Sequence, residues 1–346
     1  MKNNDVKKVL LINFGGIGDE ILFFPTIKSV KETYPNAEIY LALEKRSKSA
    51  KHLCPYIDKV FCLDIKSKFK KYFEIIKFLF KVWIKHFDVV ISSGSSKMVA
   101  ILLFLTGIKQ RYGYNSGELS ERLLTKTTLL NKNQYAGNMY HDLIRTINPD
   151  AAFSLPEIID ITPPEVKKEK PVILIHPGVS LMSIKKNIIK GWSVKRWAKL
   201  IDMLLETKQY TVLLAGGKDD EETIEKILFV LNATRTDYSD FKNLYGQTKS
   251  IQDFIALIKI SDVMVCVDSA PLHMAIASNT PVIALFGPTD EKLLVPQRNN
   301  IKVLTVKNLE CRPCLWAKRQ TSCETKECLE IHTKDVFEAI GEMLVK

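Results

Sequence analysis

The chain has 346 residues, of which 46% are hydrophobic and 26% are charged, and its formal net charge is +11. This composition excludes a disordered chain, and the length predicts about two domains. The positive charge favours a polyanionic partner, namely nucleic acid, an anionic membrane surface or a phosphorylated substrate, without choosing among them.

The N-terminal segment begins with polar residues and continues into a short apolar run over 9–14. This run is too short for a signal peptide, and no segment approaches the roughly 20 apolar residues that span a bilayer. We therefore expect a cytoplasmic protein, peripheral on the inner membrane at most. Seven cysteines in a chain of this length do not indicate a disulfide framework.

Strand and helix patterns alternate through the first half. Residues 8–14 form a buried-strand pattern, glycines then turn the chain, and 19–34 has helical spacing of its apolar residues. Further strands are predicted at 37–43 and 89–92. This alternation predicts a parallel sheet with helices on both faces.

A proline-rich and charged segment, 155–170, predicts a linker, after which the pattern restarts. The strands predicted beyond it are 171–176, 210–215, 262–267 and 281–286. We therefore predict two α/β domains, residues 1–160 and 161–346.

The first predicted strand is followed by Gly15, Gly16 and Gly18, which let the backbone turn and approach a ligand closely. Asp19 comes next, at the start of the predicted helix. One interpretation is a carboxylate that caps this helix, and the other is a general base that takes a proton from an acceptor hydroxyl.

The second half places Asp268 directly after a buried strand. Ser269 is predicted to cap the following helix, whose N-terminus is suited to binding phosphate. Thr289 leaves the next strand in the same way. The alternative is two ordinary strand-to-helix connections, with His273 as a structural histidine.

Lys190 precedes a predicted helix that contains Trp197. Its ammonium group is a candidate for neutralising a diphosphate leaving group. The alternative is an ordinary surface lysine.

Together these segments resemble the ADP-heptose:lipopolysaccharide heptosyltransferase family, glycosyltransferase family 9. The similarity follows the expected order over nearly the whole chain. The matching segments are Gly15–Asp19, His176–Gly178, Lys190–Trp192, Ala215–Gly217, Asp268–Ala275 and Val282–Asp290.

The resemblance implies the GT-B fold, with two Rossmann-like domains facing each other across a cleft. It implies that residues 1–160 bind the acceptor, with the three glycines at that site and Asp19 as base. It implies that residues 161–346 bind the nucleotide-sugar, with Lys190 at the diphosphate and Asp220 or Glu221 at the ribose. The implied donor site also includes His176, Gly178, Gly216, Asp268, Ser269, Ala270, His273 and Thr289. Many members have glycine where this chain has Ala270.

We therefore expect heptose transfer from ADP-heptose to a lipopolysaccharide core or other glycan acceptor, without a catalytic metal, since the sequence has no Asp-x-Asp motif. Alternatives are a protein hydroxyl as acceptor, another nucleotide-sugar, or a non-catalytic nucleotide-sugar-binding protein. A dehydrogenase would need GxGxxG spacing, which the first turn lacks. No motif supports nucleic-acid binding.

Four of the seven cysteines lie in the segment 311–328, at Cys311, Cys314, Cys323 and Cys328. The Cys-x2-Cys half has the spacing of a tetrahedral metal site. We expect either a structural zinc or iron ion or four reduced thiols.

Residues 66–85 combine lysines with large apolar side chains. This pattern is typical of a core-packing helix with a solvated cationic face, or of a helix on an anionic membrane, where each nearby lysine contributes about 1 kcal/mol.

Overall fold

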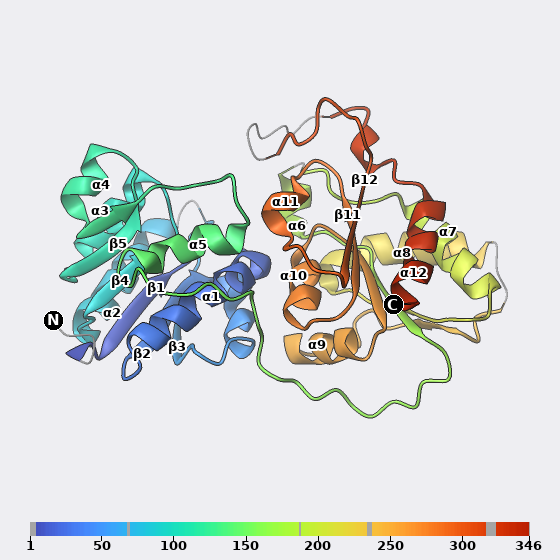
Figure 1. Cartoon of the computed structure of the whole chain (residues 1–346), viewed down its shortest axis with the longest axis horizontal. Helices are drawn as coiled ribbons and strands as arrows, with labels where there is room; N and C mark the ends of the chain where they lie inside the picture. Colours follow the sequence, from blue (N-terminus) through green and yellow to red (C-terminus); the bar gives the residue numbers. More distant parts are fainter. Residues whose placement is uncertain (1–4, 68–69, 187, 234–236, 316–322, 346) are drawn as a thin grey trace. The chain divides into compact units, whose positions relative to one another are not determined.

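The computed structural model describes residues 5–67, 70–186, 188–233, 237–315 and 323–345. The chain divides into two compact units, Met1–Ile159 and Asp160–Lys346. The boundary lies within the predicted linker, which has neither helix nor strand (Figure 1). No helix in the described part of the chain is long and apolar enough to cross a bilayer.

The first unit is built on a six-stranded parallel sheet in the order β3-β2-β1-β4-β5-β6. Its strands are β1 (Lys8–Ile12), β2 (Glu38–Glu44), β3 (Lys59–Leu63), β4 (Val89–Ser92), β5 (Gln110–Tyr114) and β6 (Lys126–Thr128). Its helices are α1 (Ile17–Thr33), α2 (Lys71–Lys85), α3 (Lys97–Leu105), α4 (Glu118–Leu123) and α5 (Ala136–Arg145), with a 3-10 helix over Lys45–His52.

Helices cover both faces of this first sheet. Right-handed crossovers place α1 and α3 on opposite faces, because the chain leaves β1 in one direction and β4 in the other. Helix α1 packs against α5. On the other face, Phe78 and Val82 of α2 and Leu103 of α3 pack in one core cluster with Leu10 and Ile12 of β1.

The second unit repeats this architecture, with the order β12-β11-β10-β7-β8-β9. Its strands are β7 (Val172–His176), β8 (Thr211–Leu214), β9 (Phe241–Asn243), β10 (Val263–Val267), β11 (Val282–Phe286) and β12 (Ile301–Thr305). Its helices are α6 (Leu181–Lys185), α7 (Val194–Glu206), α8 (Glu221–Asn232), α9 (Ile251–Lys259), α10 (Ala270–Ala277), α11 (Glu291–Leu294) and α12 (Thr333–Leu344), with 3-10 turns over Lys218–Asp220 and Glu327–Leu329.

Both sheets therefore have the doubly wound strand order of dinucleotide-binding folds. In each, the direction of winding reverses between two central strands, β1 and β4 in the first unit and β7 and β10 in the second. Ligands in such sheets bind beyond the carboxyl ends of these central strands. The predicted α/β class is confirmed, and the two reversal points are where a site is expected.

Candidate functional site

In the first unit, a hydrogen-bonded network lies beyond the carboxyl ends of β1 and β4. Asn13 follows β1 and Ser93 follows β4, and the Ser93 hydroxyl donates to the Asn13 amide oxygen at 2.5 Å. The Asn13 amide nitrogen donates to the Asp19 carbonyl at 3.3 Å and to the Glu20 carboxyl at 3.1 Å. This network fixes the start of α1 at the reversal point of the sheet.

Asp19 lies in the first turn of α1, and its side chain is partly exposed. Its Oδ2 atom accepts a hydrogen bond from the Gly16 backbone N–H at 2.7 Å. Asp19 therefore does cap the start of α1, and this contact by itself does not test the role as a base. A Cβ atom at Gly15 would lie 2.3 Å from the Asp19 Cβ. The glycine is therefore needed for the close approach of the turn to Asp19, and Gly18 lies within the same first turn.

Glu20 was not among the predicted site residues, yet it is a fully buried carboxyl next to Asp19. Burial raises its pKa well above the usual value, and the charge of Asp19 acts in the same direction, while the Asn13 hydrogen bond acts against it. A carboxyl with a raised pKa at a strand's carboxyl end is a common feature of active sites. The sequence signal was an acidic residue within the apolar side of a predicted helix.

In the second unit, Asp268 is buried directly beyond β10 and is the centre of the predicted donor site. The Lys190 ammonium lies 2.6 Å from its Oδ2 atom, and the Thr289 hydroxyl donates to the same atom at 2.6 Å. Burial by itself raises the pKa of this carboxyl, but the charge and hydrogen bond of Lys190, followed by the Thr289 hydrogen bond, bring it below the usual value. Asp268 is thus a carboxylate that holds the Lys190 ammonium in place.

Helix α10 starts immediately after this carboxylate, with Ala270 as its first residue and Pro271 in its first turn. Ser269 occupies the predicted N-cap position, but its hydroxyl donates to the Val267 carbonyl at 3.3 Å and accepts no N–H of the helix. The N–H groups at the helix start are consequently not used by Ser269. His273 is buried in the same helix, and its charged form would contribute to lowering the pKa of Asp268.

A second buried pair lies at the carboxyl end of β7, where the His176 Nε2 atom is 3.4 Å from the Asp220 carboxylate. Burial lowers the pKa of His176 and raises that of Asp220, so the imidazole is neutral near pH 7. Asp220 also accepts a hydrogen bond from the Gly217 N–H at 2.8 Å. A Cβ atom at Gly178 would lie 1.6 Å from the Asp220 carboxyl, so only glycine fits there.

The remaining two predicted residues of this region differ in exposure. Gly216 lies just after β8 and is buried, and a Cβ atom there would lie 2.9 Å from the Asp220 Cβ. Glu221 begins α8, and its side chain is exposed. The two carboxylates that the sequence could not separate therefore have different surroundings.

Arg312 is a residue of this region that sequence reasoning missed. Its guanidinium donates to the Gly287 carbonyl at 2.6 Å, to the Thr289 carbonyl at 3.0 Å and to the Glu291 carboxylate at 2.6 Å. It thus fixes the loop that carries Thr289 to the contact with Asp268. Its only sequence signal was a position within the cysteine-rich segment.

The four cysteines of segment 311–328 lie close enough for burial and then the charges of the other thiols to raise the pKa of Cys314 and Cys328, but they are not placed as ligands of one metal ion. Within the described ranges, which omit 316–322, no group of three or more His, Cys, Asp or Glu side chains is placed to hold a metal ion. Cys311 is exposed, whereas Cys328 is buried against Gly287 and its pKa is raised by burial to about 11. The Cys323 thiol accepts a hydrogen bond from the Lys326 N–H at 3.4 Å. The prediction of a zinc or iron site is therefore not supported by this arrangement.

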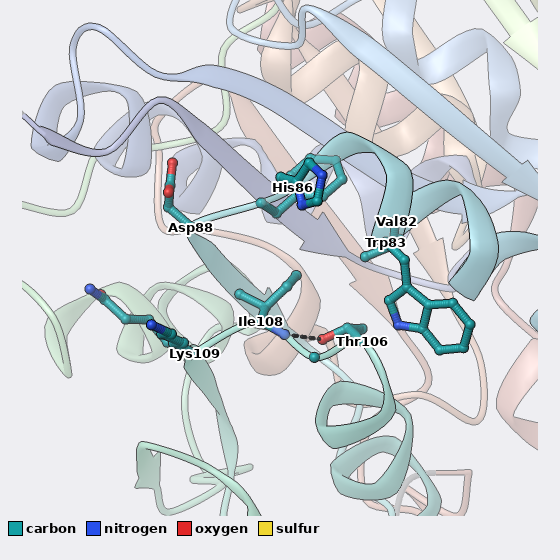
Figure 2. A pocket seen from close by; sticks show the side chains of 10 residues that line it. Val82, Trp83, His86, Asp88, Thr106, Ile108 and Lys109 are labelled. Atoms are coloured by element: carbon teal, nitrogen blue, oxygen red, sulfur yellow. Dashed lines mark hydrogen bonds between the residues drawn. The ribbon is translucent and has the colours of Figure 1, made fainter.

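A pocket of about 700 Å³ lies elsewhere, at the amino ends of β4 and β5 (Figure 2). It is lined by Trp83, His86, Asp88 and Lys109, among others, and a hydrogen bond of 3.3 Å joins the Ile108 N–H to the Thr106 hydroxyl at its wall. Since ligands of doubly wound sheets bind at the opposite edge, this pocket is separate from the candidate site.

The family model described as Glycosyltransferase family 9 (heptosyltransferase) matches residues 76–325. A lipopolysaccharide heptosyltransferase 3 from Escherichia coli is 28% identical over 301 residues, which cover 82% of this chain and 84% of the relative.

The fold is also similar to those of solved heptosyltransferase structures. The E. coli ADP-heptose lps heptosyltransferase II superposes with a TM-score of 0.75 at 22% identity, covering 98% of both chains. The E. coli heptosyltransferase WaaC with ADP-2-deoxy-2-fluoro heptose superposes with a TM-score of 0.70 at 16% identity, covering 97% of this chain and 99% of the other. At these identities the likeness establishes the fold.

Proposed function

Since this chain belongs to glycosyltransferase family 9 and is a glycosyltransferase, we propose that it transfers heptose from ADP-heptose to a hydroxyl of a lipopolysaccharide core precursor. The resemblance inferred from the motifs is confirmed at the level of the family. The observation that carries the proposal is the cluster at the reversal point of the second sheet, in which the partly exposed Lys190 contacts the buried Asp268 and Thr289 donates to the same carboxylate. A solved relative was crystallised with an ADP-sugar analogue, which supports the choice of donor.

The donor diphosphate is proposed to bind beside this cluster. Asp268 holds the Lys190 ammonium at the start of α10. The ammonium group and the N–H groups at the N-terminus of this helix together favour a bound anion. As the diphosphate leaves, its growing negative charge is stabilised by Lys190 and by the N–H groups of the helix start. This electrostatic role is the one that a metal ion has in other transferases.

The ribose of the donor is assigned to Glu221 rather than Asp220. Asp220 is buried, receives the Gly217 N–H and contacts His176, so its carboxylate is engaged inside the unit. Glu221 is exposed at the start of α8, where its carboxylate can accept hydrogen bonds from ribose hydroxyls.

The acceptor is proposed to bind to the first unit, at Gly15, Gly16 and Gly18. Asp19 acts as the general base: its carboxylate takes the proton of the acceptor hydroxyl as that oxygen attacks the anomeric carbon, and the bond from this carbon to the diphosphate breaks. The Gly16 N–H holds Oδ2 at 2.7 Å and so fixes the carboxylate at the mouth of the turn. We further propose that the enzyme works at an anionic membrane surface on the cytoplasmic side, because such an acceptor is carried on a lipid.

Calorimetry with ADP, UDP, GDP and NAD tests the donor assignment. A clear preference for ADP, weakened at least about tenfold by Lys190→Met, supports it. Lys195→Met is the matched control, since Lys195 is an exposed lysine on α7. Preference for UDP or GDP would replace the donor within the same family, and binding of NAD alone would contradict the proposed function.

A further inference from the structure

Helix α2 has an apolar face that remains exposed along its whole length. Its large side chains range in exposure from 51% at Trp83 to 70% at Tyr72. They are Tyr72, Phe73, Ile76, Phe80, Trp83 and Ile84. Their spacing places them on one side of the helix, whereas Phe78, Leu79 and Val82 face the core. Helix α2 thus has two apolar faces, and the first unit buries only one.

The exposed face continues onto α3. The Trp83 indole N–H donates to the Leu105 carbonyl at 3.0 Å, so the ends of the two helices touch. Met98, Phe104 and Leu105 of α3 are also exposed. We call the six exposed residues of α2 and these three the α2–α3 apolar face. Apolar patches larger than a few hundred Å² are rare on monomeric proteins, and they mark interaction sites.

Lysines border this face. Lys77 and Lys81 are exposed on α2 beside it, and Lys97 starts α3. The Lys77 ammonium lies 4.7 Å from the centre of the Phe73 ring. Aromatic side chains with neighbouring lysines suit the headgroup region of a bilayer, because the rings enter the acyl boundary while the ammonium groups reach the phosphates.

The direction of the two helices relates this face to the proposed base. In a parallel sheet each connecting helix runs opposite to the strands, so α2 and α3 begin at the carboxyl edge. Tyr72, Phe73 and Met98 therefore lie at the same edge of the first sheet as Asp19, which follows β1. A bilayer against this face would lie next to the edge where an acceptor is proposed to bind.

We propose that the α2–α3 apolar face docks the chain on an anionic lipid bilayer, with the aromatic side chains in the interface and the lysines against lipid phosphates. The inference rests on the proposed function in one respect, since a lipid-borne acceptor gives the docking its purpose. A second copy of the chain fits this face less well. Two copies meeting through it would bring their lysine borders together, and each copy carries a net charge of +11.

Flotation of the full chain with vesicles tests the proposal. Binding is expected with phosphatidylcholine mixed with phosphatidylglycerol, and much less with phosphatidylcholine alone. Phe73→Ser/Ile76→Ser/Phe80→Ser should lower the partition coefficient at least about tenfold, because three exposed apolar side chains no longer enter the interface. Leu129→Ser/Phe229→Ser, at exposed apolar positions elsewhere, should leave it unchanged.

The charge requirement has its own pair of variants. Lys77→Gln/Lys81→Gln should reduce binding about fivefold for each lysine and remove most of the preference for anionic lipid. Lys195→Gln/Lys199→Gln lowers the net charge equally on α7 and should have little effect.

The proposal is overturned if the wild-type chain does not float with anionic vesicles, or if the apolar variants bind as well as wild type. It is also overturned if sedimentation shows a dimer that the triple apolar variant dissociates while vesicle binding is unchanged. Heptose transfer to a delipidated, soluble acceptor separates the two proposals, because docking variants should keep this activity and loss of docking leaves the proposed function intact.

Discussion

Asp19 combines a structural contact with the proposed catalytic role, and the two can be separated by a conservative change. Asp19→Asn keeps an oxygen that accepts the Gly16 N–H but cannot take a proton. We expect kcat for heptose transfer to fall about 10²–10⁴-fold while ADP affinity stays within about twofold. Calorimetry and a transfer assay measure the two quantities.

The matched control is Asp253→Asn. Asp253 has the same capping position in α9, where it accepts the Ser250 N–H at 2.9 Å. If both substitutions reduce transfer equally, or if Asp19→Asn retains full turnover, Asp19 is not the base.

The Lys190–Asp268 pair makes a prediction on stability. Lys190→Met leaves a buried carboxylate without its cation, which should cost about 3–5 kcal/mol in the free energy of unfolding at pH 7. Lys190→Met/Asp268→Asn should recover much of this loss. Urea unfolding of the three proteins measures it, and equal stability of Lys190→Met and wild type would show that the pair is not formed.

The lowered pKa of Asp268 determines how the free energy of unfolding changes with pH. A lowered folded-state pKa stabilises the protein above the unfolded value, and that contribution is lost as the pH falls through the folded-state pKa. In Lys190→Met, burial acts without the lysine and the pKa rises. The difference in the free energy of unfolding between wild type and Lys190→Met should therefore become smaller as the pH falls from 7 to 4.

For Glu20 we expect the opposite dependence of the free energy of unfolding on pH, because burial raises the pKa of its carboxyl. The stability associated with the protonated carboxyl is present below the unfolded pKa and is lost as the pH rises through the folded-state pKa. Glu20→Gln keeps an oxygen for Asn13 and carries no charge. We expect this variant to be more stable than wild type at pH 8, with the difference disappearing at pH 4. Thermal unfolding at both pH values measures it, and a constant difference would contradict the raised pKa.

At the scale of elements, the loop from β11 to α11 depends on a side chain far along the sequence. Arg312→Ala removes three hydrogen bonds, so the Gly287 and Thr289 carbonyls and the Glu291 carboxylate lose the guanidinium as their donor. The free energy of unfolding should fall by about 1.5–3 kcal/mol. Because Thr289 then loses its fixed contact with Asp268, the KM for ADP-heptose should rise more than kcat falls.

Two further variants distinguish positioning from a general loss of stability. Arg312→Lys should restore part of the stability and of the KM. Arg298→Ala removes a guanidinium that donates to Asn279 and should leave KM unchanged. A normal KM in Arg312→Ala would show that the loop does not need this anchor.

The sequence predicted the central elements better than the peripheral ones. Strands β1, β7, β10 and β11 are almost fully buried, and their continuous apolar runs made them recognisable. Strands β3 and β12 lie at sheet edges, with most of their residues only partly buried and with lysines among them. Such short, mixed segments lack a periodic signal, so they were not predicted.

The candidate site was predictable only in part for a related reason. Asp19, Lys190 and Asp268 follow strands or occupy motif positions, so their place in the chain singled them out. Glu20 and Arg312 act through burial and through contacts distant in sequence, which no local pattern contains. For the thiols of segment 311–328, a local pattern was present, but their spacing predicted a metal site that the described residues do not form.

At the scale of the whole molecule, two units with the same strand order supply two different sites. The first unit ends its central strand in a glycine turn and a carboxylate, Asp19, whereas the second ends its own in an ion pair, Lys190–Asp268. The base proposed for the first unit and the anion-binding cluster proposed for the second are the two groups that a sugar transfer between an acceptor and a nucleotide-sugar requires.

The central claim is tested most directly by incubating the full chain with ADP-heptose and a lipopolysaccharide core that lacks heptose, and following ADP release and heptose incorporation. The account predicts that both occur only when donor and acceptor are present, that UDP-glucose and GDP-mannose do not replace ADP-heptose, and that Asp19→Asn slows both by at least about 100-fold. Incorporation of sugar from UDP-glucose or GDP-mannose with none from ADP-heptose would contradict it.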